Sequence, residues 1–170
     1  MNFEKAIQYT IKEEGWFSDH PDDRGGATKF GISIGFMRQI NPNVTTEDIA
    51  GLSLEEAKDL YKAHFWDRIR GDDLPMAMAL LTFDMAVTSG QRDAVRTLQA
   101  AVGTYEDGII GPVTIRTANE SPIQTQVVQD FSTRRVLHFS KLPGWAVFGR
   151  GWVARTFRMH DRALRMVRNG

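Results

Sequence analysis

The sequence predicts a mainly α protein with one small β element near its N-terminus. Apolar residues recur at helical spacing along most of the chain, Gly and Pro interrupt these segments, and strand-like alternation is confined to residues 28–33. The chain has 170 residues, of which 42% are hydrophobic and 25% are charged, as in an ordinary globular domain. We therefore expect one helical globular unit.

The first helix is expected at residues 2–14. Phe3, Ile7 and Ile11 lie four residues apart and define one apolar face, and Glu14 follows three residues later on the same face. A glycine comes directly after Glu14 and supplies the usual stop signal. The first helix should therefore end at Glu14.

The remaining elements follow from capping signals and apolar runs. Thr45 with Asp48, and Ser53 with Glu56, have the spacing of capping boxes. The apolar run at residues 76–88 is too short to span a membrane and suits a buried central helix. We expect a long loop with a small hairpin at residues 16–33, a helical turn after residue 45, and helices at residues 33–41, 53–65, 76–88, 92–102, 114–120, 122–137 and 151–167.

The composition excludes several kinds of site. The chain has no cysteine, so it has no disulfide, thiolate metal site or cysteine nucleophile. Its four histidines are scattered, without the spacing of a zinc motif, so we expect no metal and no cofactor. Residues 1–14 lack the apolar stretch of a signal peptide, and no window is long enough to span a bilayer. We expect a monomer without a cleavable signal peptide or a membrane span.

The net charge is zero, but positive charge is concentrated at the C-terminal end. Residues 131–170 hold nine Lys or Arg and one acid, Asp161, which gives this segment a formal charge of +8 and leaves −8 for the rest. Such a segment favours a polyanionic partner, whether nucleic acid, anionic lipid, lipopolysaccharide or acidic cell wall, unless it only balances acidic neighbours within the fold. No nucleic-acid docking motif accompanies it, so nucleic acid is not expected. Four arginines at helical spacing should share an outward face: Arg155, Arg158, Arg162 and Arg165.

Glu14 is the strongest catalytic candidate. A carboxylate in the last turn of a helix faces the negative end of the helix dipole, and partial burial on the apolar face also disfavours its charged form. We therefore expect a raised pKa for Glu14, which a general acid requires. Asp23 and Thr28 would add a second carboxylate and a hydroxyl, the set that cleaves a glycosidic bond. Taken alone, the position of Glu14 also fits a residue that only faces solvent.

Residues 14–33 carry a family signature. The run EGWFSDHPDDRGGATKFGIS resembles, without a gap, the N-terminal signature of glycoside hydrolase family 108, which reads E-G-G-[YF]-x-[ND]-x-P-x-D-[PR]-G-G-x-T-x-[YF]-G-I-[TS]. Residues 61–75 and 82–99 look like further segments of the family, and residues 148–152 look like its C-terminal end. Residues 107–114 (DGIIGPVT) are similar to the D-G-x-x-G-x-x-T turn of peptidoglycan-binding modules.

The match has two departures. Trp16 replaces the second glycine of the signature, and Thr88 stands where the family has Asn. The first departure affects the loop that follows the acid, and the second affects a sugar contact that an amide would make. Neither changes the position of the acid.

The resemblance implies a lysozyme-like helical domain with a small β-hairpin near the active site. It implies an N-acetylmuramidase of the phage endolysin kind, which hydrolyses the β-1,4 bond between N-acetylmuramic acid and N-acetylglucosamine in bacterial peptidoglycan and so lyses the host cell. The family's catalytic glutamate falls on Glu14 rather than Glu13, and Asp23 and Thr28 take the matching downstream positions. Substrate contacts are expected at Phe17, Lys29, Phe30 and Asp84, while the buried setting of Asp84 also fits a structural anchor, and Trp66 is expected in the core.

The resemblance also implies an organisation along the chain. Residues 1–95 would form the lysozyme-like catalytic region, and residues 96–170 a helical peptidoglycan-binding-like region packed in the same globular unit. The protein would be made in the host cytoplasm and act on peptidoglycan in the periplasm. The alternative is a non-catalytic peptidoglycan-binding or secretion-assisting protein with the same fold. The sequence leaves open whether the reaction inverts or retains configuration, because that outcome depends on the distance between two carboxyl groups.

Overall fold

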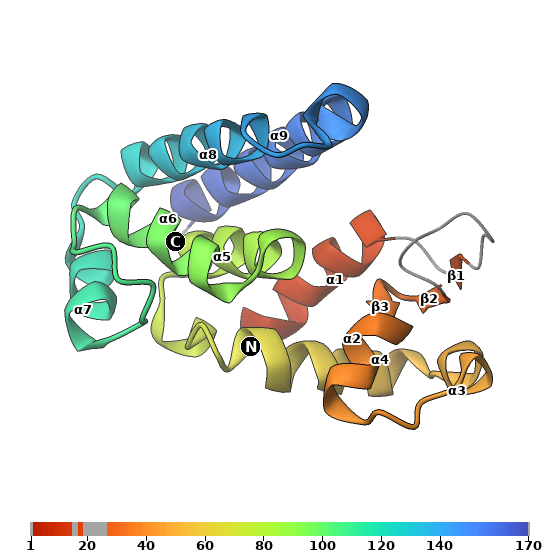
Figure 1. The fold of residues 1–170 in the computed structure, drawn as a ribbon. Helices are drawn as coiled ribbons and strands as arrows, with labels where there is room; N and C mark the ends of the chain where they lie inside the picture. Colours follow the sequence, from red (N-terminus) through yellow and green to blue (C-terminus); the bar gives the residue numbers. More distant parts are fainter. Residues whose placement is uncertain (1, 15–16, 19–26, 170) are drawn as a thin grey trace. The chain divides into compact units, whose positions relative to one another are not determined.

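The computed structural model describes residues 2–14, 17–18 and 27–169, and these are mainly helical (Figure 1). The expected class, mainly α with a small β element, is confirmed. The helices are α1 (Asn2–Glu14), α2 (Ile34–Ile40), α3 (Thr46–Gly51), α4 (Leu54–Tyr61), α5 (Met76–Ser89), α6 (Gln91–Val102), α7 (Pro112–Glu120), α8 (Gln124–Ser140) and α9 (Trp145–Asn169). The strands are β1 (Phe17–Ser18), β2 (Thr28–Lys29) and β3 (Ile32–Ser33).

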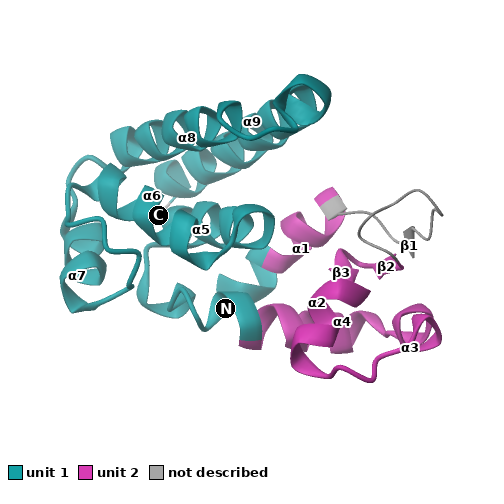
Figure 2. Ribbon diagram, viewed as in Figure 1, with its two compact units in different colours: residues 1–6, 64–170 teal, residues 7–63 magenta. Residues whose placement is uncertain are grey.

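Contacts divide the chain into two compact units (Figure 2). The larger unit comprises residues 1–6 and 64–170, and the smaller unit comprises residues 7–63, so α1 begins in one and ends in the other. The boundary that we expected at residue 95 falls inside α6, and the division into catalytic and wall-binding regions stays a prediction. Among the described helices, none combines the length and apolar character needed to cross a membrane.

The smaller unit contains a three-stranded antiparallel sheet with the strand order β1-β2-β3. Phe17 pairs with Lys29 and Ser18 pairs with Thr28, while Thr28 also pairs with Ser33 of β3. The sequence predicted a small hairpin within residues 16–33 and strand-like alternation over residues 28–33, and the structure divides that stretch into β2 and β3 by a turn at Phe30 and Gly31. As a result, Thr28 lies in the central strand, between two partners.

The caps of the next three helices follow the sequence signals. Ser33 caps α2, since its side chain accepts a hydrogen bond from the backbone N–H of Phe36 at 3.1 Å. Both predicted capping boxes, at the starts of α3 and α4, are confirmed. These short helices share a small apolar cluster formed by Ala27, Ile34, Val44 and Ile49.

The larger unit is organised around α5. Its residues 77–86 are all buried, as expected for a helix that is apolar on every side. α5 contacts α6, α8 and α9, and α8 and α9 lie side by side as an antiparallel pair (Figure 1). α9 begins at Trp145, six residues before the expected start at residue 151, and it continues through two glycines.

An aromatic cluster packs around Phe83 of α5. Phe3, Trp66 and Phe83 meet edge to face, with ring centroids 5.6–6.1 Å apart. Trp66 is fully buried, which confirms its expected place in the core, and it is the last residue of a π-helical turn at Lys62–Trp66. Gly71 packs against the indole so closely that a Cβ atom at this position would lie 2.4 Å from a ring atom. Trp66 can therefore occupy its buried position only because residue 71 has no side chain.

We predict that Gly71→Ala destabilises the protein by about 2–3 kcal/mol, because the buried indole cannot move away from the added methyl group without overpacking its neighbours. Gly51→Ala is the matched control. Gly51 ends α3, and its Cβ would meet no atom within 4 Å, so this variant should keep or gain about 0.5 kcal/mol. Urea unfolding of both variants measures the difference. Equal midpoints for the two variants would contradict the packing argument.

Candidate functional site

The expected catalytic residues belong to the first elements of the smaller unit. Glu14 is the last residue of α1, Thr28 lies in β2, and both fall within residues 7–63. Asp23 lies outside the described residues, as does Trp16. The side chains of Glu14 and Phe17 are also outside what the structure describes, although their backbones belong to α1 and β1.

The sheet brings Thr28 back to the chain that leaves α1. Ser18 follows Glu14 by four residues and is the direct partner of Thr28 across the β1–β2 pair. Opposed residues of an antiparallel pair have Cα atoms about 4.5–5.5 Å apart. The register therefore holds the backbone of Thr28 beside the segment that follows the helix end.

An unusual turn fixes this hairpin. Phe30 and Gly31 connect β2 to β3 with φ angles of 51° and 79°, the left-handed pair that a type I′ turn requires. Glycine adopts this conformation freely, but for phenylalanine it costs roughly 1–3 kcal/mol. The buried hydroxyl of Tyr61 donates a hydrogen bond of 2.9 Å to the carbonyl oxygen of Phe30 and holds the turn from α4. Local sequence signals do not reveal this contact of Tyr61, although the helical spacing of Ala57 and Tyr61 marks the buried face of α4.

Lys29 and Phe30 have structural contacts of their own. The ammonium group of Lys29 donates a hydrogen bond of 2.6 Å to the carbonyl oxygen of Ala50 and lies 5.5 Å from the centre of the Phe30 ring. The Phe30 side chain is 6% exposed, so stacking on a sugar would require the ring to be uncovered. The contacts of both residues anchor the hairpin to α3 and α4, and their contact with substrate stays a prediction.

Asp84 belongs to the larger unit and forms a buried ion-pair network. Its carboxylate lies 2.7 Å from the guanidinium groups of both Arg135 of α8 and Arg155 of α9, and the Asp84 and Arg135 side chains are fully buried. Burial raises the pKa of Asp84, but the charges of Arg135 and Arg155 outweigh it and hold the pKa below its usual value. Thr88 accepts a hydrogen bond of 3.3 Å from Arg135. Of the two roles expected for Asp84, these contacts are those of a structural anchor.

The position of Arg155 corrects the expected outward row of arginines. Its side chain is only 12% exposed and points to Asp84, with three N–H···O contacts of 2.7–3.2 Å. Arg158 and Arg165 are exposed, and Arg165 pairs with Asp161 at 2.8 Å. Helical spacing placed the arginines near one another correctly, but Arg155 stands at the edge of the buried stripe, where α5 supplies a partner.

The turn at residues 107–114 is held by one buried amide. The side-chain nitrogen of Gln99 donates to the Asp107 carboxylate at 2.7 Å and to the Ile109 carbonyl at 3.1 Å, while its oxygen accepts from the N–H of Gly108 at 2.9 Å. The hydrogen bond from Gln99, and then that from the N–H of Ile109, lower the pKa of Asp107. The conspicuous Asp and Gly of this turn therefore have structural contacts, and Ile109 is left 70% exposed.

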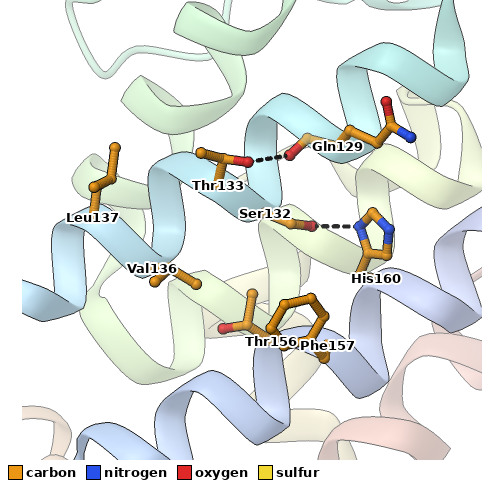
Figure 3. A pocket seen from close by; sticks show the side chains of 8 residues that line it. All are labelled: Gln129, Ser132, Thr133, Val136, Leu137, Thr156, Phe157 and His160. Atoms are coloured by element: carbon orange, nitrogen blue, oxygen red, sulfur yellow. Dashed lines mark hydrogen bonds between the residues drawn. The ribbon is translucent and has the colours of Figure 1, made fainter.

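Two pockets open among the described residues of the larger unit. One, of about 330 Å³, lies between α8 and α9, where His160 Nδ1 is 3.0 Å from Ser132 Oγ (Figure 3). Because Ser132 already donates its single proton to the Val128 carbonyl at 2.8 Å, Nδ1 of His160 must be the donor to Ser132. A serine held in this way is not activated as a nucleophile.

The second pocket, of about 360 Å³, is polar and lies between α6 and α8. Its lining combines both signs of charge, with Arg96 and Lys141 among the cations and Asp93 and Glu106 as the acids. Among the described residues, no group of three or more His, Asp or Glu side chains is placed to hold a metal ion. These pockets therefore add no catalytic group to the set in the smaller unit.

Comparison with known proteins bears on the smaller unit and on the whole chain. The model of the family described as Glycosyl hydrolase 108 matches residues 7–90, a segment that contains every candidate site residue. Among solved structures, the chain is similar to the structure of Brucella abortus SagA, with a TM-score of 0.87 and 32% sequence identity over 96% of this chain and 94% of that chain. None of the curated proteins compared matches it. The expected lysozyme-like, mainly α fold is confirmed.

We predict that Asp84→Asn costs about 3–5 kcal/mol, because it leaves two buried guanidinium groups without their counter-charge. In the parent the lowered pKa of Asp84 means that its stabilisation is complete above the ordinary value of 3.8 and is lost as the pH falls through the lowered value. The variant should therefore lose less stability than the parent on acidification below that pH. Denaturant unfolding at neutral and acidic pH measures both effects.

Asp161→Asn is the matched control, since it breaks an ion pair with Arg165 whose side chains are 60% and 72% exposed. Its cost should stay below about 0.5 kcal/mol. A comparable loss in the two variants would mean that the buried network has no special weight.

Proposed function

Because the chain belongs to the glycosyl hydrolase 108 family, we propose that it is an N-acetylmuramidase that acts as a phage endolysin. A member of this family is a glycoside hydrolase. The proposed substrate is bacterial peptidoglycan, cut at the β-1,4 bond between N-acetylmuramic acid and N-acetylglucosamine. The observation that carries the proposal is that α1 ends at Glu14 and that β1, which begins at Phe17, belongs to a sheet whose central strand contains Thr28.

The proposed chemistry begins with proton transfer from the Glu14 carboxyl group to the leaving glycosidic oxygen. The anomeric carbon develops oxocarbenium character as its bond to that oxygen breaks. The oxygen of a water molecule then bonds to this carbon, and a carboxylate takes up the proton that the water loses. Asp23 and Thr28 are assigned to holding this water or steadying the charge. The end of α1 supports the role of Glu14, because the negative end of a helix dipole favours the protonated carboxyl group.

The remaining parts of the proposal concern the wall and the cell. Residues 96–170 are assigned to peptidoglycan binding, supported by the exposed Ile109 and Val113 at the 107–114 turn. Arg158 and Arg165 remain exposed cations that attract an anionic envelope surface, without the contribution of Arg155. The protein is proposed to be a monomer that is made in the host cytoplasm and acts on peptidoglycan in the periplasm.

We predict that Glu14→Gln abolishes wall lysis and leaves the free energy of unfolding equal to or slightly above that of the parent, because it removes a negative charge from the C-terminal end of a helix. Loss of a general acid costs about 10²–10⁴-fold in rate. The neighbouring Glu13→Gln should keep its activity and serves as the control. Turbidity loss of purified walls gives the rate, and new reducing-end muramic acid in the digest identifies the bond.

Several outcomes would overturn this assignment. Retention of more than about a tenth of the parent rate in Glu14→Gln would remove Glu14 as the acid. Reducing-end glucosamine or cut peptides would exclude a muramidase. Wall binding by the purified parent without any cleavage would favour the non-catalytic peptidoglycan-binding or secretion-assisting alternative.

We further predict that Asp23→Ala is severely impaired and that Thr28→Ala loses activity as well, because each removes a group assigned to the water or the developing charge. Asp22→Ala is the matched control, being the variable neighbour of Asp23 in the family signature. Rates on the same wall preparation compare the three variants. If Asp22 were essential and Asp23 dispensable, the register chosen for the signature would be wrong.

A further inference from the structure

The connection between α8 and α9 forms a compact tip, which we define as residues 141–152. The four residues between the helices are fixed by backbone hydrogen bonds, from Leu142 N to Phe139 O at 3.0 Å and from Trp145 N to Leu142 O at 3.0 Å. The first turn of α9 is closed by a bond from Phe148 N to Gly144 O at 2.8 Å. The tip is therefore an ordered surface.

Two large apolar side chains project from this tip. Val147 is 76% exposed and Phe148 is 58% exposed, and they are consecutive. Leu142, Trp145 and Trp152 are half-buried beside them. Single exposed apolar residues are common on protein surfaces, whereas a cluster with aromatic neighbours marks an interaction site.

The tip is built to hold its aromatic rings in place. Trp152 packs on Phe139 with ring centroids 5.2 Å apart, and Phe148 packs on Trp152 at 5.9 Å. A Cβ atom on Gly144 would lie 3.0 Å from the Phe148 ring and 3.1 Å from the Trp152 ring, and one on Gly149 would lie 2.8 Å from the Trp145 ring. The glycines thus give room for rings that remain partly exposed, and an interaction surface arranged in advance loses less entropy on binding.

Along the sequence, the charged residues in and near the tip are all basic. Residues 131–160 contain no Asp, Glu, Asn or Gln, while Lys141 and Arg150 are exposed at the tip itself. Lys141 borders the polar pocket that Glu106 and Asp93 also line. Residues 131–160 therefore offer no side-chain carboxylate or amide to the hydroxyl groups of a sugar or the amides of a peptide. Tryptophan, exposed apolar side chains and flanking Lys and Arg are instead the composition of a surface that enters the interface of an anionic bilayer.

We propose that the tip docks on the surface of an anionic phospholipid bilayer. Val147 and Phe148 enter the boundary between headgroups and acyl chains, and the two tryptophans lie at headgroup level. Lys141 and Arg150 approach the lipid phosphates, which attract basic residues near a membrane surface. Such docking would hold the enzyme at a membrane face, and it does not depend on the proposed hydrolysis.

The test is flotation of the full-length protein with vesicles of phosphatidylcholine plus phosphatidylglycerol, compared with vesicles of phosphatidylcholine alone. The parent should bind the anionic vesicles, and Val147→Ser with Phe148→Ser should weaken this binding by about tenfold or more. The matched control is Val113→Ser with Phe157→Ser, which removes the same residue types at 58% and 62% exposure elsewhere. This control should bind like the parent. Because all four positions are exposed, unchanged thermal midpoints should accompany every result.

A second pair of variants tests the charge. Lys141→Gln with Arg150→Gln should weaken binding to anionic vesicles and reduce its dependence on salt, while Lys5→Gln with Arg68→Gln, at exposed positions outside the tip, should not. Several results would overturn the proposal: no vesicle binding by the parent, equal loss in the apolar tip and control variants, or equal loss in the two charge variants. So would a tip variant that loses binding to purified peptidoglycan, or changes its oligomeric state, while its vesicle binding is unaltered. The vesicles contain no peptidoglycan, so a failure here is distinguishable from failure of the proposed hydrolysis.

Discussion

The carboxylate of Asp84 is the constraint around which the larger unit is arranged. It is the charged residue of an otherwise apolar or hydroxyl-bearing central helix, and it is fully buried. A buried charge without a partner is far costlier than one with good hydrogen-bonding geometry, so α8 and α9 must present Arg135 and Arg155 to this point. The hydrophobic effect is non-directional, so it alone would not fix how far α8 or α9 is shifted along its axis or rotated about it. The ion pairs with Asp84 do fix these positions, and they thereby select one arrangement of the three helices.

In the smaller unit, hydrogen bonds hold the β2–β3 hairpin in place. Its apolar cluster is small, and its strands are only two residues long, so packing alone gives the hairpin little support. The left-handed backbone conformation of Phe30 also adds an unfavourable conformational free energy to the turn. Tyr61 and Lys29 offset it by tying the hairpin to α4 and α3 through the carbonyl oxygens of Phe30 and Ala50. The central strand that contains Thr28 is thus held at its C-terminal end, at Lys29 and Phe30.

Local signals predicted most helices, because capping boxes and periodicity act within a few residues. The boxes at Thr45 and Ser53 are present as the spacing required. The start of α9 was missed because Gly149 and Gly151 weaken a helix locally, and the packing of Trp145 onto Gly149 is a contact that propensity does not contain. For the site, the sequence located Glu14 at the end of α1 and Thr28 in a strand, but the β1 pairing that relates them depends on register. The Arg155 side chain points inward because it pairs with Asp84, and helical spacing does not predict a pairing between residues so far apart in the sequence.

The excess positive charge of the C-terminal segment has a different meaning once its partners are known. Arg135 and Arg155 face inward to Asp84, Arg134 pairs with Asp130, and Arg165 pairs with Asp161. A formal charge of +8 over residues 131–170 therefore overstates what this segment presents to solvent. Two of these cations, Arg135 and Arg155, hold α5, α8 and α9 together, while Arg134 and Arg165 pair within their own helices. The cations at Lys141 and Arg150 stand instead beside exposed apolar side chains, which gives the tip of α8 and α9 an amphipathic chemistry that a simple count of charges does not reveal.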